Sequence, residues 1–124
     1  MYDKRLALET LLLVNESLGL IIRRTQHLLS VDDFYLNEDG MVLLDSVCMK
    51  LIAVGESVKN IDKITNKQLL PNYPEIPWKD VMGLRDIIVH HYFDVDGEQI
   101  FKTIKQDIPL LIKSLDRMIE NLQS

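Results

Sequence analysis

The sequence lacks most of the features that identify a chemical site at first sight. It contains one cysteine, Cys48, which can form no internal disulfide and lies in an apolar run typical of a small core side chain. The absence of disulfides fits the reducing cytoplasm, where we expect the protein to be located. Fourteen basic and nineteen acidic residues give a net charge of −5. This balance argues against a broad nucleic-acid-binding surface, although a local basic site remains compatible with it.

Long hydrophobic runs and common binding motifs are also missing. Polar residues interrupt the most apolar stretch, residues 6–22, and no clean apolar run follows Lys4 and Arg5, so neither a membrane span nor a signal peptide is predicted. The sequence has no Gly-x-x-x-x-Gly-Lys or Gly-x-Gly-x-x-Gly phosphate loop, and no His-Glu-x-x-His or Cys-x-x-Cys metal motif. We therefore expect no ordinary nucleotide-binding fold, no metal site and no cofactor, and we assign Asp94 and Asp96 to a turn before the last helix.

Helical periodicity is the clearest pattern that the sequence does contain. Apolar residues recur every three or four positions, and no stretch shows the alternation of a β-strand. Residues 65–77 hold three prolines and are predicted to form a loop. The sequence thus predicts an all-α, up-and-down four-helix bundle in a single domain of residues 1–124. The predicted helices span about residues 3–29, 41–61, 77 to between 90 and 92, and 97–122, with one further helical turn at 31–36.

Two residues within the predicted helices should affect how they pack. Gly55 lies near the apolar stripe of the second helix and would allow another helix to approach closely. Pro109 lies inside the last helix, where we expect it to remove one hydrogen bond and bend the helix rather than end it.

Arg85, His90, His91 and Tyr92 form the local set best suited to acid–base and phosphate chemistry. An arginine offers a rigid fork of donors to a phosphate, and a histidine exchanges a proton near neutral pH. Together they suffice for metal-free RNA cleavage, in which the 2′-hydroxyl attacks the neighbouring phosphate. On an ideal helix Arg85 and His90 would lie about 140° apart, so they converge only if the helix frays at His90 or two subunits contribute. The alternative is an arginine paired with a carboxylate and a histidine that caps a helix C-terminus.

Several separate blocks of the sequence resemble the HepT toxins, a group within the HEPN superfamily. The family motif is an arginine, four to six residues, a histidine and, two residues later, a tyrosine, which Arg85, His90 and Tyr92 match. The resemblance covers about residues 40–120. The matching blocks are Gly55-Glu56-Ser57-Val58, Pro74-Glu75-Ile76-Pro77-Trp78, Met82-Gly83-Leu84-Arg85-Asp86, His90-His91-Tyr92-Phe93-Asp94-Val95-Asp96 and Asp107-Ile108-Pro109.

The resemblance implies that the chain is a ribonuclease toxin that acts as a homodimer. In such a dimer, Arg85 and His90 of both copies would meet in a composite, metal-independent cleft that binds RNA, with Glu56 and Asp86 as supporting residues. The implied partner is an MNT-type nucleotidyltransferase antitoxin, which would transfer AMP from ATP to Tyr92. The added phosphodiester would place negative charge where the substrate phosphate should lie, and would thereby silence the toxin.

Two positions depart from the family pattern. His91 occupies the variable position, so Arg85 and His91 also satisfy the broader motif, but the tyrosine register favours His90. Asp86 follows the arginine at a position where asparagine is frequent in the family. Its carboxylate would partly offset the positive charge of Arg85. A different class of function also stays open, namely a non-catalytic helical dimer that binds a nucleotide or a partner protein.

Overall fold

Helices make up the regular structure in the computed structural model, which describes residues 2–91 and 93–124. For this part of the chain the predicted all-α class is confirmed. A 3₁₀ turn, η1 (Leu70–Asn72), and a π-helical turn, η2 (Thr103–Asp107), lie between the longer helices. The α-helices in chain order are α1 (Lys4–Thr25), α2 (Asp32–Tyr35), α3 (Glu38–Ile64), α4 (Trp78–Met82), α5 (Leu84–His90), α6 (Gly97–Lys102) and α7 (Ile108–Gln123).

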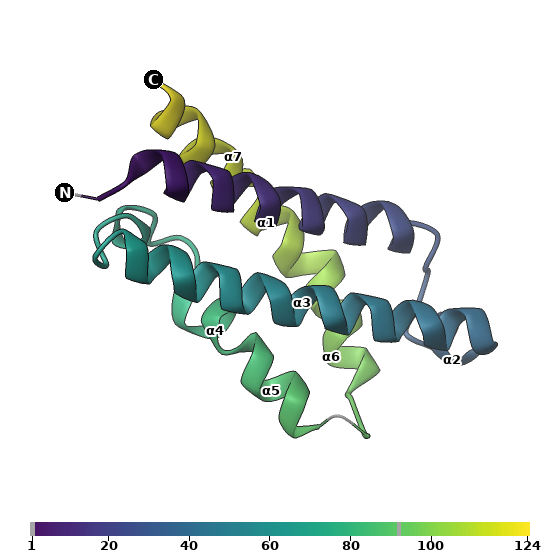
Figure 1. The fold of residues 1–124 in the computed structure, drawn as a ribbon. Coiled ribbons are helices and arrows are strands. Elements are labelled where there is room, and N and C mark those ends of the chain that lie inside the picture. The colour runs from purple at the N-terminus through teal and green to yellow at the C-terminus, as the bar shows by residue number, and fades with distance from the viewer. Residues whose placement is uncertain (1, 92) are drawn as a thin grey trace.

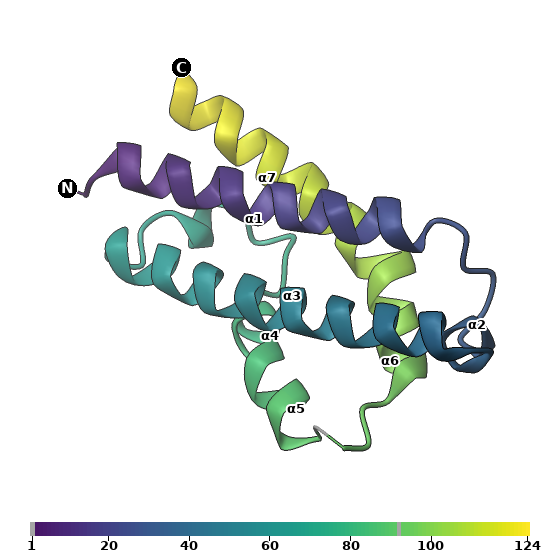
Figure 2. The same cartoon turned by 45° about the vertical axis from the view of Figure 1, so that its right-hand side comes forward.

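The long helices α1 and α3 run antiparallel and side by side (Figure 1). α7 packs against α1, while α4 and α5 pack against α3 (Figure 2). The apolar stripe predicted on α3 is buried, with Leu51 and Val58 at most 1% exposed. Cys48 on the same helix is buried as predicted, and this burial raises the pKa of its thiol to about 11. By contrast, α5 contributes only Ile88 to the buried set, so it lies at the edge of the core.

The end of α1 differs from the predicted one. The helix ends at Thr25 rather than Leu29, because the Asp33 carboxylate accepts hydrogen bonds from the backbone N–H groups of Leu29 and Ser30 at 2.7 and 3.2 Å. These donors stabilise the ionised carboxylate and lower the pKa of Asp33. The chain therefore leaves α1 early and forms the short helix α2, close to the helical turn expected at residues 31–36.

α3 is longer than the predicted range of 41–61 at both ends. It begins at Glu38 because the Asn37 side chain accepts a hydrogen bond from the backbone N–H of Gly40 at 2.9 Å and caps the helix. It continues to Ile64, beyond the last residue of the predicted stripe. The predicted range was too short because it followed the apolar stripe, which is shorter than the helix that carries it.

The third predicted helix is two short helices, and the prediction of one continuous helix is wrong at Gly83. The backbone N–H of Gly83 donates to the carbonyl oxygens of Lys79 and Asp80 at 3.1 and 3.2 Å, which closes α4. The Gly83 carbonyl then accepts from the Ile87 N–H at 3.2 Å at the start of α5. This region lies against Gly55 of α3, where a Cβ atom would come within 3.0 Å of the α4 backbone. The predicted close helix approach at Gly55 is confirmed.

The last predicted helix runs on through Pro109 but changes its winding. α6 begins at Gly97 as predicted, and the Asp96 carboxylate caps it by accepting from the Gln99 N–H at 3.2 Å. The wider π-helical turn η2 directly precedes α7, and Pro109 lies in the first turn of α7, where its missing N–H is tolerated. The prediction that the helix does not end at Pro109 is confirmed, and the π-helical turn before it is a feature that was not predicted.

The proline-rich loop between α3 and α4 is anchored to α7. The Glu75 carboxylate accepts hydrogen bonds from the Ser114 hydroxyl and the Arg117 guanidinium, both at 2.9 Å. The Trp78 indole N–H donates to the Tyr73 carbonyl at 2.9 Å, which joins the end of the loop to the start of α4. These contacts fix the end of the loop, and with it the start of α4, against α7.

Candidate active site

Arg85 lies in the first turn of α5, where this helix touches α3. Gly55 permits the contact, because a Cβ atom added there would lie 3.4 Å from the Arg85 backbone nitrogen and 3.0 Å from the Val81 carbonyl oxygen. A larger side chain would push α5 outward, since packed backbones leave no spare volume. α3 therefore sets the position of the Arg85 backbone.

The Arg85 guanidinium faces two carboxylates. Its Nε lies 3.4 Å from Glu56 Oε1, and its Nη1 lies 3.6 Å from Asp86 Oδ1. Both distances exceed the roughly 2.7–2.9 Å of a strong charge-assisted hydrogen bond, and 48% of the Arg85 side chain is exposed. Such exposed pairs typically contribute about 0–1 kcal/mol, so a phosphate can compete for the guanidinium.

His90 is the last residue of α5, and the helix backbone holds its ring. His90 Nδ1 lies 2.6 Å from the carbonyl oxygen of Asp86, one turn earlier. Because a carbonyl oxygen only accepts hydrogen bonds, Nδ1 carries the proton, and in the neutral ring Nε2 carries the free lone pair. The exposed His90 ring therefore has one defined basic nitrogen.

His91 has different contacts from His90. It follows the end of α5, and its Nδ1 lies 3.7 Å from Asp94 Oδ1, close enough for an ion pair when the ring is protonated. The His91 carbonyl also accepts from the Asp94 N–H at 3.0 Å, so Asp94 belongs to the turn, as predicted. Tyr92, the residue expected to be modified, lies outside the described residues.

The structure does not bring Arg85 and His90 together within one chain. α5 is helical through His90, so the fraying that would let the two side chains converge is not found. Among the contacts of the described residues, no ion pair or hydrogen bond joins the two side chains; each contacts Asp86 instead, Arg85 at the carboxylate and His90 at the carbonyl. Both features of the structural alternative, a carboxylate-paired arginine and a histidine bound at a helix end, are therefore present.

The expectations of no metal site and no membrane span concern all residues that the structure describes. Within residues 2–91 and 93–124, no three histidine, cysteine, aspartate or glutamate side chains gather closely enough to hold a metal ion. In the same residues, no helix combines the length and apolar character needed to cross a membrane.

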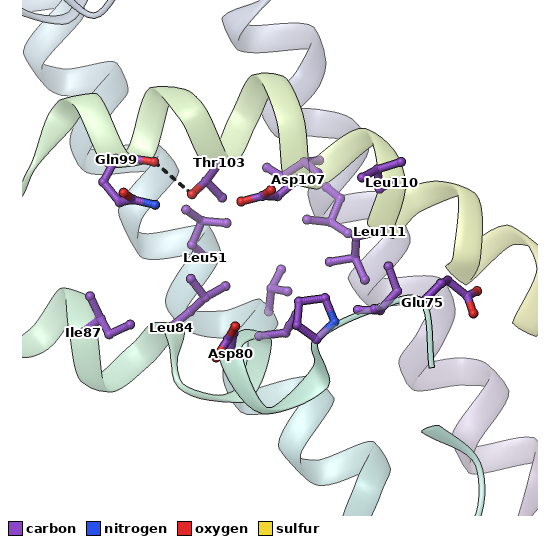
Figure 3. Close-up of a pocket in the computed structure, with 16 residues that line it drawn as sticks. Leu51, Glu75, Asp80, Leu84, Ile87, Gln99, Thr103, Asp107, Leu110 and Leu111 are labelled. Atoms are coloured by element: carbon purple, nitrogen blue, oxygen red, sulfur yellow. Dashed lines mark hydrogen bonds between the residues drawn. The ribbon is translucent and has the colours of Figure 1, made fainter. Parts of the chain in front are cut away.

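A groove of about 430 Å³ lies between α4–α5 and the η2–α7 stretch, and neither predicted catalytic residue lines it. Figure 3 shows Leu84 and Ile87 of α5 on one side of this apolar groove and Leu111 of α7 on the other. The carboxylates of Asp80 and Asp107 also belong to its lining. Since Ile87 is 57% exposed, the groove wall continues into apolar surface that faces solvent.

A family model described as Ribonuclease HepT-like matches residues 14–118, a range that includes Glu56, Arg85, Asp86 and His90. The chain belongs to the HepT-like ribonuclease family. The resemblance inferred from the sequence motifs is thereby confirmed, and all four predicted site residues other than Tyr92 are described by the structure.

Several curated proteins are similar to the HepT-like chain. One named "Probable ribonuclease HepT", from Thermococcus cleftensis, is 38% identical over 73 residues, which are 59% of this chain and 63% of that protein. One named "Putative RNase", from Methanocaldococcus jannaschii, is 37% identical over 76 residues, 61% of this chain and 60% of that protein. Another "Putative RNase", from Caldanaerobacter subterraneus, is 32% identical over 92 residues, 74% of this chain and 76% of that protein. The chain thus spans 60% of the length of the Methanocaldococcus relative. No solved structure matches it significantly.

The sequence predicted a backbone contact of His90 only in the non-catalytic alternative, as a cap of the helix C-terminus, and did not identify the Asp86 carbonyl as its partner. The spacing of four residues between Asp86 and His90 contained the signal, because side chains near a helix C-terminus can bind the last carbonyl groups. A histidine at the predicted end of a helix is a candidate for such a contact whenever the residue four positions earlier is helical.

Proposed function

We propose that the HepT-like chain is a metal-independent ribonuclease in which Arg85 binds the scissile phosphate and His90 transfers protons. The observation that carries this proposal is the arrangement around Asp86, which contacts the Arg85 guanidinium through its carboxylate and the His90 imidazole through its carbonyl. The loosely held guanidinium can accept a new anion, and the imidazole has a basic Nε2. The names of the relatives support RNA as the substrate.

In the proposed reaction, His90 Nε2 accepts the proton of a ribose 2′-hydroxyl while its oxygen attacks the adjacent phosphorus. The bond from phosphorus to the 5′ oxygen breaks, and a proton from a second histidine or from water neutralises that leaving oxygen. Arg85 stabilises the negative charge that builds up on the non-bridging oxygens. The products are one RNA end with a 2′,3′-cyclic phosphate and one with a free 5′-hydroxyl.

The proposal includes a two-fold homodimer of four-helix, up-and-down bundles, with α4, α5 and the proline-rich loop at the interface. It is supported by the divergence of Arg85 and His90 on α5, which a symmetric second copy would overcome. It is also supported by the apolar groove, whose lining includes Ile76 and Pro77 of the loop and the exposed Ile87 of α5. Contact with a second copy would remove this apolar surface from water.

We also propose a regulatory role for Tyr92 within a single cytoplasmic domain of residues 1–124. The chain would be the toxin of a toxin–antitoxin pair, and the partner an MNT-type nucleotidyltransferase that moves AMP from ATP to the Tyr92 hydroxyl. The support is the family membership and the place of Tyr92 in the sequence, two residues after His90. A phosphodiester there would compete with the RNA phosphate for Arg85.

The experiment that tests the ribonuclease is a digest of RNA by purified protein with and without EDTA. Cleavage should persist in EDTA and leave 2′,3′-cyclic phosphate ends, and Arg85→Ala and His90→Ala should abolish most of it without altering the circular dichroism spectrum. A protein that binds a nucleotide or a protein partner but cuts no RNA would instead be the non-catalytic dimer considered above.

Mass spectrometry after incubation with the antitoxin and ATP tests the role of Tyr92. One or more AMP units should appear on the peptide that contains Tyr92. Tyr92→Phe should keep RNA cleavage, because the hydroxyl is not needed as an acid or base, and should escape silencing. AMP attached to another residue, or no AMP, would refute this part of the proposal.

A further inference from the structure

A basic hollow at the C-terminal end of α3 has no part in the reaction proposed above. Its volume is about 480 Å³. Three lysines and one aspartate give the hollow a charge of +2, although the whole chain carries −5. The lining residues are Lys59, Asp62, Lys63, Asn66 and Lys67.

In the described part of the chain, the three lysines of this basic hollow have no carboxylate partner. Within the described residues, every side-chain ion pair involves another cation, and the Asp62 carboxylate at the same hollow pairs with none of the three. Lys59, Lys63 and Lys67 are all exposed. Like charges gathered in a concave surface raise the local positive potential and attract anions.

Lys67 also occupies a backbone conformation that lysine rarely adopts. The φ angles of Asn66 and Lys67 are 55° and 60°, in the left-handed region. Asparagine tolerates this region, but for most other residues it costs roughly 1–2 kcal/mol, a strain that glycine avoids. The Lys67 N–H donates to the Asp62 carbonyl at 2.8 Å, which folds the chain back over the last turn of α3. A cationic side chain is thus kept at a position where glycine would end the helix with less strain, which points to a role for the side chain.

α3 connects the basic hollow to Arg85. Glu56, which pairs with Arg85, precedes Lys63 by seven residues, so the two lie about 20° apart around the helix and about 10 Å apart along its axis. Lys59 lies between them and about 60° from Glu56 around the same helix. Figures 1 and 2 show that α4 and the start of α5 lie along the C-terminal half of α3. The hollow is lined by residues at the C-terminal end of the same helix. A strand with its scissile phosphate at Arg85 can therefore continue along α3 towards the hollow.

We infer that Lys59, Lys63 and Lys67 form a subsite for the phosphate backbone of single-stranded RNA beside the cleavage site. The inference rests on the proposed ribonuclease function and adds the path of the substrate. Lysine ammonium groups bind phosphates as point charges without reading the base sequence, so the subsite strengthens binding to any sequence. It also gives a chain with a net charge of −5 a local basic site on the proposed path of the RNA.

The test measures binding of a fluorescent single-stranded RNA by anisotropy over a range of salt concentrations. The parent protein is His90→Ala, so that the RNA is not cut during the measurement. The slope of log affinity against log salt is negative, and each phosphate contact on a single strand contributes about −0.7 to it. Replacing all three subsite lysines with glutamine should therefore make the slope less steep by about 2. The difference in affinity should therefore widen about a hundredfold for each tenfold decrease in salt. The matched control replaces three exposed lysines on other helices with glutamine, Lys4, Lys102 and Lys113, which changes the net charge equally.

Each outcome of this experiment decides the inference. The inference is supported if the salt dependence becomes less steep in the subsite variant but not in the control. Replacing the three lysines with arginine should then keep the affinity of the parent protein. Equal losses in both triple variants, or unchanged binding in the subsite variant, overturn the inference. Failure of the wild-type chain to cut RNA refutes the ribonuclease proposal and the subsite with it. Normal cleavage with an unchanged KM and salt dependence, when the three lysines are replaced with glutamine in the wild-type chain, refutes the subsite alone.

Discussion

His90 Nδ1 lies 2.6 Å from the backbone carbonyl oxygen of Asp86. A backbone acceptor has a position fixed by the helix and does not ionise, so it orients the imidazole whatever side chain residue 86 carries. The Asp86 carboxylate has a looser contact, 3.6 Å from the Arg85 guanidinium. One residue thus acts on the two predicted catalytic groups in two different ways, and the contact through the backbone is the shorter.

Replacement of the two adjacent histidines should have unequal effects. His90→Ala should reduce the rate of RNA cleavage by about 10²–10⁴-fold, the usual contribution of a general acid or base. His91→Ala should leave most of the rate, because the His91 ring lies beside Asp94 in the turn after α5. Single-turnover cleavage assays on the two variants make the comparison. A large loss in His91→Ala with a mild effect of His90→Ala would show that the motif is in the other register.

The contact between α3 and α5 should make Gly55→Ala unfavourable. An alanine normally stabilises a helix interior by about 0.5–1 kcal/mol relative to glycine. At Gly55 the new Cβ would lie 3.0 Å from the Val81 carbonyl oxygen and 3.4 Å from the Arg85 nitrogen, backbone atoms that move only with their helices. We therefore expect Gly55→Ala to lower the free energy of unfolding and, by displacing Arg85, the rate of RNA cleavage. Overpacking of this kind typically costs about 1–3 kcal/mol.

Gly19→Ala is the matched control for this substitution. Gly19 lies inside α1, where an added Cβ would meet only the Arg23 guanidinium at 3.5 Å. Its substitution should raise the free energy of unfolding by about 0.5–1 kcal/mol. Urea denaturation of both variants gives the comparison, and an equal gain in stability at the two positions would show that the α3–α5 contact is not tight.

The anchoring of the proline-rich loop should depend on pH. Its own backbone N–H, the Ser114 hydroxyl and the Arg117 guanidinium lower the pKa of Glu75 from its ordinary 4.5. Because the folded-state pKa lies below the unfolded one, the stabilisation is fully present above about pH 4.5 and is lost as the pH falls through the folded-state value. Glu75→Gln should therefore be less stable than the wild type at pH 7, and the difference should shrink below pH 4.5.

Urea denaturation at several pH values between 7 and about 3 measures this effect. The control is Glu120→Gln, which removes a carboxylate from the same helix as Arg117 but outside the Glu75 contacts. A gap between wild type and Glu75→Gln that stays constant down to the lowest pH would contradict the assignment of the effect to the Glu75 carboxylate.

The parts of the fold that repeat along the chain were predictable from the sequence. The buried stripe of α3, for example Leu51 and Val58, recurs at every helical turn because a core-facing helix must be apolar on one side. The end of α1 was not predictable from periodicity, because it depends on Asp33, which lies outside the helix. Likewise the break at Gly83 lies against Gly55, which is 28 residues earlier in the sequence and on another helix.

The main geometric difficulty of the candidate site was predictable from the sequence. The spacing of Arg85 and His90 showed that they diverge on one helix, and the structure places them in that way at either end of α5. The orientation of the His90 ring was not predicted, since it depends on a backbone carbonyl that every residue possesses. Side-chain chemistry is therefore visible in the sequence, whereas the contribution of the backbone becomes visible only once the helix is built.

The divergence of Arg85 and His90 makes complementation between two inactive chains the sharpest test of a composite site. If Arg85 of one copy acts with His90 of the other, Arg85→Ala and His90→Ala should each be inactive alone and recover activity when co-expressed. Half of the dimers would be mixed, and one of the two Arg85–His90 pairs in each would be intact, so activity should reach about one quarter of wild type. Two different affinity tags isolate the mixed dimer, and two differently tagged Arg85→Ala chains provide the inactive control. A mixed dimer that is isolated but cuts no RNA, or a wild-type chain that is monomeric by light scattering at micromolar concentration, would show that the site is not shared between copies.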